Sequence, residues 1–310
     1  MPLAGGIFFS LPAGFVSSRG RVLFDARLKA RATVAKIRLM KEHINEEGVY
    51  VPRPLTDFPE DPLEHLQQPV VIRQIDVERA DYPFYDKSFK AKVWRVACFC
   101  IVRWILSFMQ KVRYDLKIIG RKKVNKRNPL FKDGALIVCN HVYRWDFVAA
   151  MQAANYHYLY FPARAANLAG KDARWIVGIG GIPVPETLSA QRRFNEAFGE
   201  LHKKKKWFFV FPEMTRWDYY QPLRPFQVGA FKMALRYEVP VIPMVISFRK
   251  PSGLRKLLNR THPLITIHVG DPIPYKVEEG EKRKDVIARM IKEARTQMLK
   301  MAGIKQNCWD

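Results

Sequence analysis

From residue 114 onward, short apolar runs of strand length alternate with longer stretches of helical periodicity. Such alternation is typical of parallel strands that are joined by crossover helices. We therefore predict an α/β fold, with a mainly parallel central sheet covered by helices, in a domain of residues 114–310. The expected strands lie near 114–119, 135–140, 157–162, 207–211, 240–248 and 264–269. The expected helices lie near 146–155, 171–178, 189–204, 226–237 and 281–302.

Residues 1–88 differ from this domain in charge and in proline content. Lys and Arg balance Asp and Glu over these residues, so the whole formal net charge of +24 lies in residues 89–310. A helical pattern over 22–44 precedes an acidic segment, 49–88, that carries repeated prolines. Proline removes a backbone donor and interrupts regular elements. We expect an N-terminal extension made of a helix and an irregular acidic arm.

The positive charge of residues 89–310 indicates an anionic partner. A nucleic-acid backbone, an anionic bilayer and a phosphorylated substrate or acidic carrier all fit such a field. Charge alone does not choose among these three. The four cysteines show no Cys-x-x-Cys spacing, so neither a metal site nor a disulfide framework is expected, and a reducing compartment fits best.

The segment 89–113 combines aromatic and aliphatic residues with flanking lysines and arginines. Such a helix suits the headgroup region of a bilayer, where it would lie in the membrane plane. The alternative is a buried helix whose Arg95 and Arg103 extend to solvent. No segment has the roughly 18–20 uninterrupted apolar residues of a spanning helix, so we expect the chain not to cross the bilayer.

A histidine and an aspartate follow the apolar run 135–140. The end of the expected strand places His141 at the carboxyl edge of the sheet, where ligands collect in open α/β folds. Asp146, at the start of the next helix, can turn back and orient the imidazole for proton abstraction from a hydroxyl. The pair resembles a catalytic triad without its serine. Alternatively, Asp146 caps its helix.

A second polar group follows the apolar run 207–211. The string Phe-Pro-Glu-Met-Thr-Arg places Glu213, Thr215 and Arg216 after the expected strand. A fixed guanidinium and a hydroxyl in such a turn can hold a phosphate. The sequence contains no Gly-x-Ser-x-Gly elbow, phosphate-binding P-loop, dinucleotide fingerprint or His-Glu-x-x-His motif, so the enzymes that depend on those motifs are not supported.

These strings together resemble the glycerolipid acyltransferase family, which includes 1-acylglycerol-3-phosphate acyltransferase. The similarity covers about residues 114–275. The matching blocks are Asn140-His141 with Asp146, Phe161 to Arg164, Gly181 to Val184, Phe211 to Arg216 and Val239 to Pro243.

The resemblance implies transfer of a fatty acyl group from acyl-CoA or acyl-carrier protein to the free hydroxyl of a lysophosphatidic-acid-type acceptor in phospholipid synthesis. It implies that His141 is the general base and that Asp146 orients it. Four residues would bind substrate: Arg164, Glu213, Thr215 and Arg216. No cofactor beyond the acyl donor is implied. The expected location is the cytoplasmic face of an anionic membrane, as a peripheral or monotopic protein.

Some positions depart from the family pattern. Met214 replaces the usual glycine, Tyr143 stands where serine is common, and Pro185-Glu186 replaces an Asp-Arg pair. The last change removes an expected phosphate-binding arginine, so acceptor identity stays open. Another lysolipid or polar acceptor, transacylation between phospholipids, and a non-enzymatic basic protein that binds membrane or nucleic acid are the alternatives. We expect no nucleic-acid partner.

Overall fold

The computed structural model describes residues 43–44, 48–67, 71–72, 75–125, 127–258 and 262–310. All of them belong to a compact unit that begins at Glu42. The helix predicted over 22–44 lies outside the described residues, except at its last two positions. There the prediction is wrong, because β1 (His43–Ile44) pairs with β2 (Tyr50–Val51) as a short antiparallel ladder.

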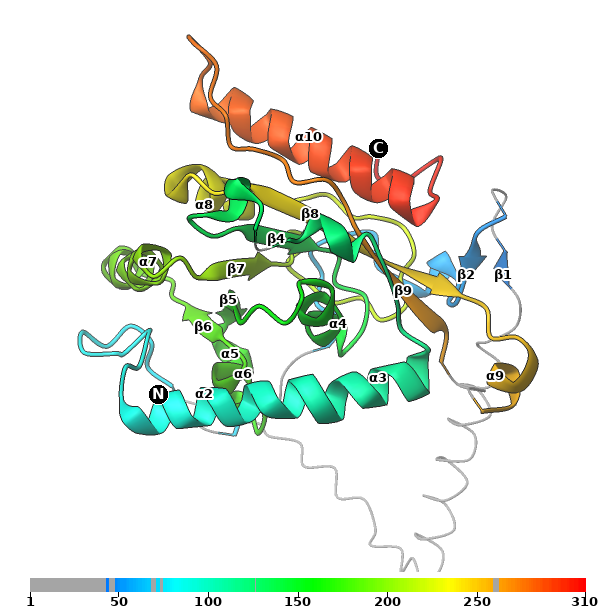
Figure 1. The fold of residues 1–310 in the computed structure, drawn as a ribbon, viewed down its shortest axis with the longest axis horizontal. Helices are drawn as coiled ribbons and strands as arrows, with labels where there is room; N and C mark the ends of the chain where they lie inside the picture. Colours follow the sequence, from blue (N-terminus) through cyan, green and yellow to red (C-terminus); the bar gives the residue numbers. More distant parts are fainter. Residues whose placement is uncertain (1–42, 45–47, 68–70, 73–74, 126, 259–261) are drawn as a thin grey trace, which may run out of the picture. The chain divides into compact units, whose positions relative to one another are not determined.

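Seven strands of the described residues form one central sheet, in the order β3-β9-β8-β4-β7-β5-β6 (Figure 1). Neighbouring strands run parallel except β8 and β9, which are antiparallel. The predicted mainly parallel α/β sheet is confirmed. The strands are β3 (Lys117–Ile119), β4 (Leu136–Cys139), β5 (Leu159–Arg164), β6 (Gly181–Val184), β7 (Trp207–Val210), β8 (Val241–Arg249) and β9 (Leu264–Val269).

The central strand β4 is buried along its whole length. Its side chains alternate between two apolar clusters, as expected for a parallel strand that is covered on both faces. Ile137 and Cys139 pack with residues of α4 (Asp146–Ala153). Leu136 and Val138 pack on the other face with residues of α7 (Leu188–Lys203), α8 (Gly229–Tyr237) and α10 (Arg283–Ala302). Helices therefore cover both faces of the sheet (Figure 1).

The five helices predicted within 114–310 are all present, with ends within a few residues of those expected. The α-helices of this region are α4 (Asp146–Ala153), α5 (Ala165–Leu168), α6 (Ala173–Gly178), α7 (Leu188–Lys203), α8 (Gly229–Tyr237), α9 (Gly253–Leu258) and α10 (Arg283–Ala302), and the short 3-10 helices are η3 (Arg121–Lys123) and η4 (Pro129–Phe131). Helices α5 and α9 and strand β6 were not predicted. Gly180 makes the turn into β6 at a φ of +110°, where a Cβ would collide with the carbonyl oxygen of Leu159.

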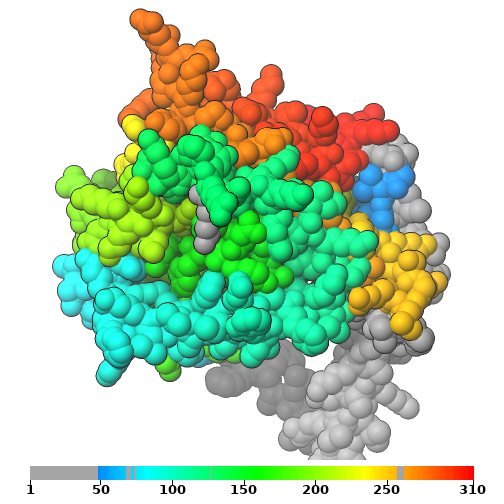
Figure 2. Space-filling model, in the orientation of Figure 1, coloured from blue at the N-terminus to red at the C-terminus, as the bar shows by residue number. Residues whose placement is uncertain are grey.

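A continuous helical segment covers the predicted interfacial stretch. It consists of α2 (Phe89–Ile101), a π-helical turn η2 (Val102–Leu106) and α3 (Ser107–Tyr114). Its outer face carries exposed apolar side chains. Figure 2 shows the segment at the surface, coloured cyan to teal. The exposed apolar residues are Phe89, Val93, Val96, Trp104, Ile105, Phe108 and Val112.

This segment also has the length and composition of a membrane-spanning helix, although it lacks the uninterrupted apolar run expected of one from the sequence. Its 26 residues, Phe89–Tyr114, are long and apolar enough to cross a membrane. Its inner face packs on the domain, because Cys98 and Val102 are fully buried. Arg95 is also buried and lies over the Tyr85 ring, whereas Arg103 is exposed. The helix is thus packed on the domain along its inner face and exposed to solvent along its outer face.

Candidate active site

The two polar strings meet because their strands are neighbours. Strands β4 and β7 pair in parallel, so their carboxyl ends reach the same edge of the sheet. Asn140, directly after β4, accepts a hydrogen bond from Ile246 N and donates one to Ile246 O at 2.8 and 3.0 Å. These two bonds fix the end of β4 against β8, and His141 comes next along the chain.

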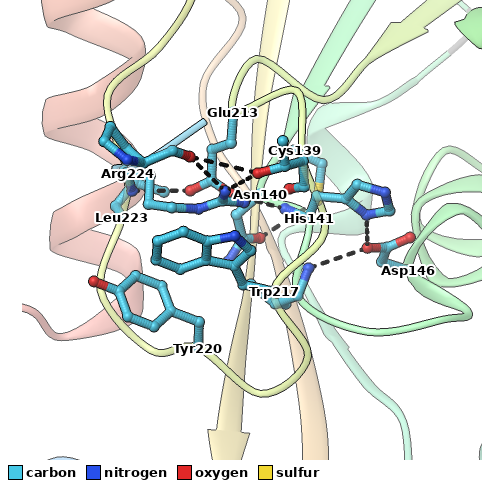
Figure 3. Close-up of polar contacts among 12 residues, drawn as sticks. Cys139, Asn140, His141, Asp146, Glu213, Trp217, Tyr220, Leu223 and Arg224 are labelled. Atoms are coloured by element: carbon cyan, nitrogen blue, oxygen red, sulfur yellow. Dashed lines mark hydrogen bonds and ion pairs between the residues drawn. The ribbon is translucent and has the colours of Figure 1, made fainter. Parts of the chain in front are cut away.

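His141 and Asp146 form a close pair (Figure 3). Nδ1 of His141 lies 2.5 Å from Oδ2 of Asp146, whose side chain is 2% exposed. The carboxylate also accepts backbone N–H groups of Val142, at 3.2 Å, and Phe147, at 2.8 Å. Asp146 is the first residue of α4, and it satisfies one backbone N–H of the first turn while it holds the imidazole. The N-cap position is Trp145, which makes no side-chain cap bond, so the capping alternative for Asp146 is wrong.

The imidazole of His141 is also fixed by stacking. The Phe211 ring lies parallel to it, with centroids 3.8 Å apart and an interplanar angle of 10°. The His141 side chain keeps 20% exposure, and within the described part of the chain its Nε2 has no hydrogen-bond partner. With Asp146 accepting from Nδ1, Nε2 is the nitrogen that can take a proton from a bound hydroxyl.

Glu213 and Thr215 are placed inside the protein. Glu213 is fully buried and pairs with Arg224, whose Nη2 lies 3.0 Å from its Oε2 (Figure 3). Thr215 is 2% exposed, and Arg224 donates to its hydroxyl and to its carbonyl oxygen. The role in substrate binding stays a prediction for both residues. Their contacts show that they shape the turn after β7.

Arg224 organises this turn, and no sequence motif pointed to it. It is buried, lies 4.4 Å from the Trp217 ring centroid, and donates to the carbonyl oxygen of Pro62. Nothing in the loop around it has the periodicity of a buried element, so an arginine there looks like an ordinary surface charge.

Arg216 lies at the surface end of this turn, with its side chain 27% exposed. It pairs with Asp218 at 3.1 Å and donates to the carboxamide oxygen of Gln67. Gln67 in turn donates to Asp218 at 2.7 Å. The guanidinium predicted to hold a phosphate is therefore already compensated by a carboxylate and an amide.

Arg164 ends β5, one strand further along the sheet. Burial first, and then the positive charges of Arg164 and Arg224, lower the pKa of His65 below its ordinary value of 6.5. The carbonyl oxygens of Pro62 and Glu64, in the acidic arm, accept hydrogen bonds from Arg224 and Trp217, so the arm passes over the turn after β7. Arg164 and Arg216 thus belong to the same edge of the sheet as His141.

The same arm reaches the start of α7. The carboxylate of Glu78 accepts the backbone N–H groups of Glu186 and Thr187, at 2.7 and 3.2 Å, and the Thr187 hydroxyl. Arg193 donates to the carbonyl oxygen of Glu78. A carboxylate is favourable at a helix N-terminus. The Glu78 carboxylate therefore lies at the start of α7, next to Glu186, which stands where the resembled family has a phosphate-binding arginine.

Comparison with known proteins agrees with this geometry. Residues 115–247 match the model of a family described as Acyltransferase. The matched segment contains β4, β7, the His141–Asp146 pair and the Glu213–Arg224 turn. Residues 115–247 are therefore similar to an acyltransferase domain.

Particular relatives are similar over part of the chain. The 1-acyl-sn-glycerol-3-phosphate acyltransferase alpha of Ovis aries is 29% identical over 155 residues, which are 49% of this chain and 53% of that protein. An uncharacterized acyltransferase of Schizosaccharomyces pombe is 25% identical over 231 residues, or 70% and 72% of the two chains. The chain thus spans about half the length of the first of these relatives.

A solved structure also shows similarity. The 1-acyl-sn-glycerophosphate acyltransferase PlsC of Thermotoga maritima is 19% identical, with a TM-score of 0.43, covering 69% of this chain and 84% of that one. Within the described residues of the present chain, no group of three or more His, Cys, Asp and Glu side chains is placed to hold a metal ion.

Proposed function

We propose that this protein transfers a fatty acyl group from a thioester, acyl-CoA or acyl-carrier protein, to the free hydroxyl of a lysophosphatidic-acid-type acceptor. The observation that carries this proposal is the 2.5 Å contact between His141 Nδ1 and Asp146 Oδ2, which leaves Nε2 open at the carboxyl edge of the sheet. The acyltransferase-family match over the same residues supports it.

The chemistry needs no protein nucleophile. Nε2 of His141 takes the proton of the acceptor hydroxyl while the hydroxyl oxygen bonds to the thioester carbonyl carbon. Asp146 stabilises the imidazolium that forms. The carbon–sulfur bond then breaks, and the leaving thiolate takes the proton back from the imidazolium. An ester and a free thiol result, and His141 returns to its starting state.

The surroundings of Arg216 favour a second candidate acceptor class. Asp218 already neutralises Arg216, and Glu186 stands where the family has a basic residue. A dianionic phosphate monoester would meet both carboxylates if they face it. A lysolipid with a phosphodiester or uncharged headgroup would avoid this repulsion, so such acceptors belong in the same test.

The test is acyl transfer from radiolabelled acyl-CoA, and from acyl-carrier protein, to a panel of lysolipids. The panel contains lysophosphatidic acid, lysophospholipids with phosphodiester headgroups and a monoacylglycerol. Product with lysophosphatidic acid alone supports the first candidate, and product with the others alone supports the second. No product with any combination of donor and acceptor would contradict the proposal.

We also propose that helix Phe89–Tyr114 seats the domain on the cytoplasmic face of an anionic membrane. The support is its exposed apolar face, which includes Trp104 at 68% and Phe108 at 70% exposure, beside lysines and arginines at both ends. Aromatic side chains and flanking cations suit the headgroup region. The acceptor and product of the proposed reaction would also reside in this layer.

A further inference from the structure

A groove of about 520 Å³ lies beside the helical segment, away from the His141–Asp146 pair. Polar groups line it from Lys111 of α3, Arg121, Gln152 of α4 and Tyr156, and apolar groups from Phe108 and Ile118. Gln152 lies six residues beyond Asp146, about 9 Å along α4 at 1.5 Å per residue. The groove is therefore at the opposite end of α4 from the proposed catalytic pair.

Gln152 is the buried polar group of this groove. The residue is 6% exposed, and its Nε2 has no hydrogen-bond partner among the described residues. A buried amide without a partner destabilises a fold, and such groups in native proteins usually have a ligand or a water to satisfy them. Nε2 itself has essentially no accessible surface in this structure, so an oxygen-rich ligand in the groove would supply the missing acceptor once the amide turns toward it.

The charged side chains that line the groove favour an anionic ligand. Lys111 and Arg121 line it, and none of its described lining residues is Asp or Glu. The neighbouring carboxylate, Asp115, lies 3.6 Å from the Lys111 ammonium but is also paired with Arg249 at 3.2 Å and Arg255 at 3.3 Å. Its charge is thus shared among three cations. The groove keeps a net positive charge.

The backbone on both sides of the groove departs from regular structure. The π-turn Val102–Leu106 ends just before Ser107, which lines the groove and donates its hydroxyl to Val102 O at 2.8 Å. Tyr156 has a φ of +56°, which is strained for a bulky side chain. Both π-turns and such strain are enriched at functional sites.

The groove opens beside the exposed apolar helix. Phe108 belongs to both, because it lines the groove and contributes to the outer face of α3. Figure 2 shows this helix uncovered, with the green region that includes α4 beside it. A ligand with a phosphate in the groove could therefore lay apolar chains over Phe108 and along the helix.

We propose that this groove binds the phosphate of an anionic phospholipid, held by Lys111, Arg121 and Gln152, as a site additional to the acyl-transfer site. The choice of a lipid rests on the proposed seating of the helix on a membrane. The binding itself is measurable without a bilayer and without activity.

The experiment is isothermal titration calorimetry of the full chain with dihexanoyl phosphatidylglycerol, a short-chain anionic lipid, below its micelle concentration. Lys111→Gln and Arg121→Gln should each weaken binding about fivefold, as expected for loss of one cation near a phosphate. The matched control is Lys117→Gln, which removes the same charge from the exposed residue next to Ile118 and should leave binding unchanged.

Gln152→Leu distinguishes binding in this groove from nonspecific attraction between charges, because the substitution leaves the net charge of the protein unchanged. It should weaken lipid binding at least as much as Lys111→Gln, while raising the unfolding temperature of the lipid-free protein by removing the unpaired amide. If Lys117→Gln weakened lipid binding as much as Lys111→Gln does, the proposed site would be wrong. Unchanged lipid binding in Gln152→Leu would also contradict it.

Two further ligands identify the source of the phosphate. Dihexanoyl phosphatidylcholine, which has no net charge, should bind more weakly than phosphatidylglycerol. Inorganic phosphate should bind more weakly as well, because it makes no contact with Phe108. Equal affinity for inorganic phosphate and phosphatidylglycerol would overturn the lipid assignment. Because no measurement here uses acyl transfer, failure of this proposal and failure of the proposed activity are distinguishable.

Discussion

The backbone N–H of His141 donates a hydrogen bond to Oε2 of Glu213, 3.0 Å away. Seventy-two residues separate the two positions along the chain, and the parallel pairing of β4 with β7 brings them together. Oε1 of the same carboxylate accepts the backbone N–H of Arg224, also at 3.0 Å. Glu213 thus ties the carboxyl end of β4 to the turn after β7.

Loss of Arg224 should destabilise the fold strongly. Arg224→Met leaves the carboxylate of Glu213 buried without its cation, which typically costs about 3–5 kcal/mol of unfolding free energy. Glu213→Gln with Arg224→Met should cost less than the sum of the two single changes, because no buried charge remains. Urea unfolding at pH 7 measures all three.

The control for this prediction is Arg289→Met. It breaks a pair with Glu281, 2.9 Å apart, that lies at the surface. Such pairs contribute about 0–1 kcal/mol. Equal losses in the Arg224 and Arg289 variants would show that burial of the Glu213–Arg224 pair has no energetic consequence.

The compensation of Arg216 by Asp218 predicts a kinetic difference between variants. Asp218→Asn should lower the Michaelis constant for lysophosphatidic acid, because Arg216 then faces the phosphate without a competing carboxylate. Arg216→Lys should raise the same constant about tenfold through loss of the bidentate fork, with little change for the acyl donor. Steady-state kinetics with each substrate varied in turn measures both effects.

Arg192→Lys on the exposed face of α7 is the matched control and should change neither constant. An unchanged acceptor constant in Arg216→Lys would assign Arg216 to holding Gln67 and Asp218 instead of substrate. A rise with phosphate-free acceptors of the same size would point to the same structural role.

The position of the acidic arm predicts the titration of His65. Burial, and then the charges of Arg164 and Arg224, hold the pKa of His65 below 6.5. Arg164→Gln should raise this pKa part of the way back, since burial remains. The unfolded chain binds the proton at higher pH, so stability from this residue is full above pH 6.5 and falls as the pH drops below it.

Histidine ring signals in an NMR titration measure this pKa directly, with His65→Gln to assign the resonance. A wild-type pKa at or above 6.5, or no response to Arg164→Gln, would mean that the arm does not lie over the edge of the sheet in solution.

The exposed face of the helical segment predicts membrane binding. Trp104→Ser with Ile105→Ser removes two exposed apolar side chains and should weaken binding to anionic vesicles by tenfold or more, at roughly 1.5–3 kcal/mol for each fully buried apolar side chain. Leu254→Ser, at a 71% exposed apolar residue of α9, is the control. Equal sedimentation of all three proteins with vesicles would contradict the interfacial placement.

The sequence predicted those parts of the structure that depend on local pattern. Strand β4 is a run of apolar residues because both its faces are buried, and the His141–Asp146 contact follows from the strand end and the helix start. Strand β6 was not predicted because it is four residues long and contains Pro183. Such a strand is tolerated at the edge of a sheet, where β6 lies.

Contacts between distant segments could not be predicted in this way. Gln67 reaches Arg216 across 149 residues, and Glu78 reaches Thr187 across 109. No local sequence pattern marks Gln67 or Glu78, because the partner of each depends on how the irregular arm runs over the domain. The burial of Arg224 likewise depends on where Pro62 and Trp217 come to lie.

The general-base role of His141 is tested by the acyl-transfer rates of His141→Ala and Asp146→Asn against the wild-type protein, with circular dichroism to show that each variant is folded. His141→Ala should lower turnover by about 10²–10⁴, the usual contribution of a positioned general base. Asp146→Asn should also lower it, because the imidazole loses the carboxylate that orients Nδ1 and stabilises the imidazolium. Turnover near the wild-type rate in a folded His141→Ala variant, with any acceptor, would contradict the proposed mechanism.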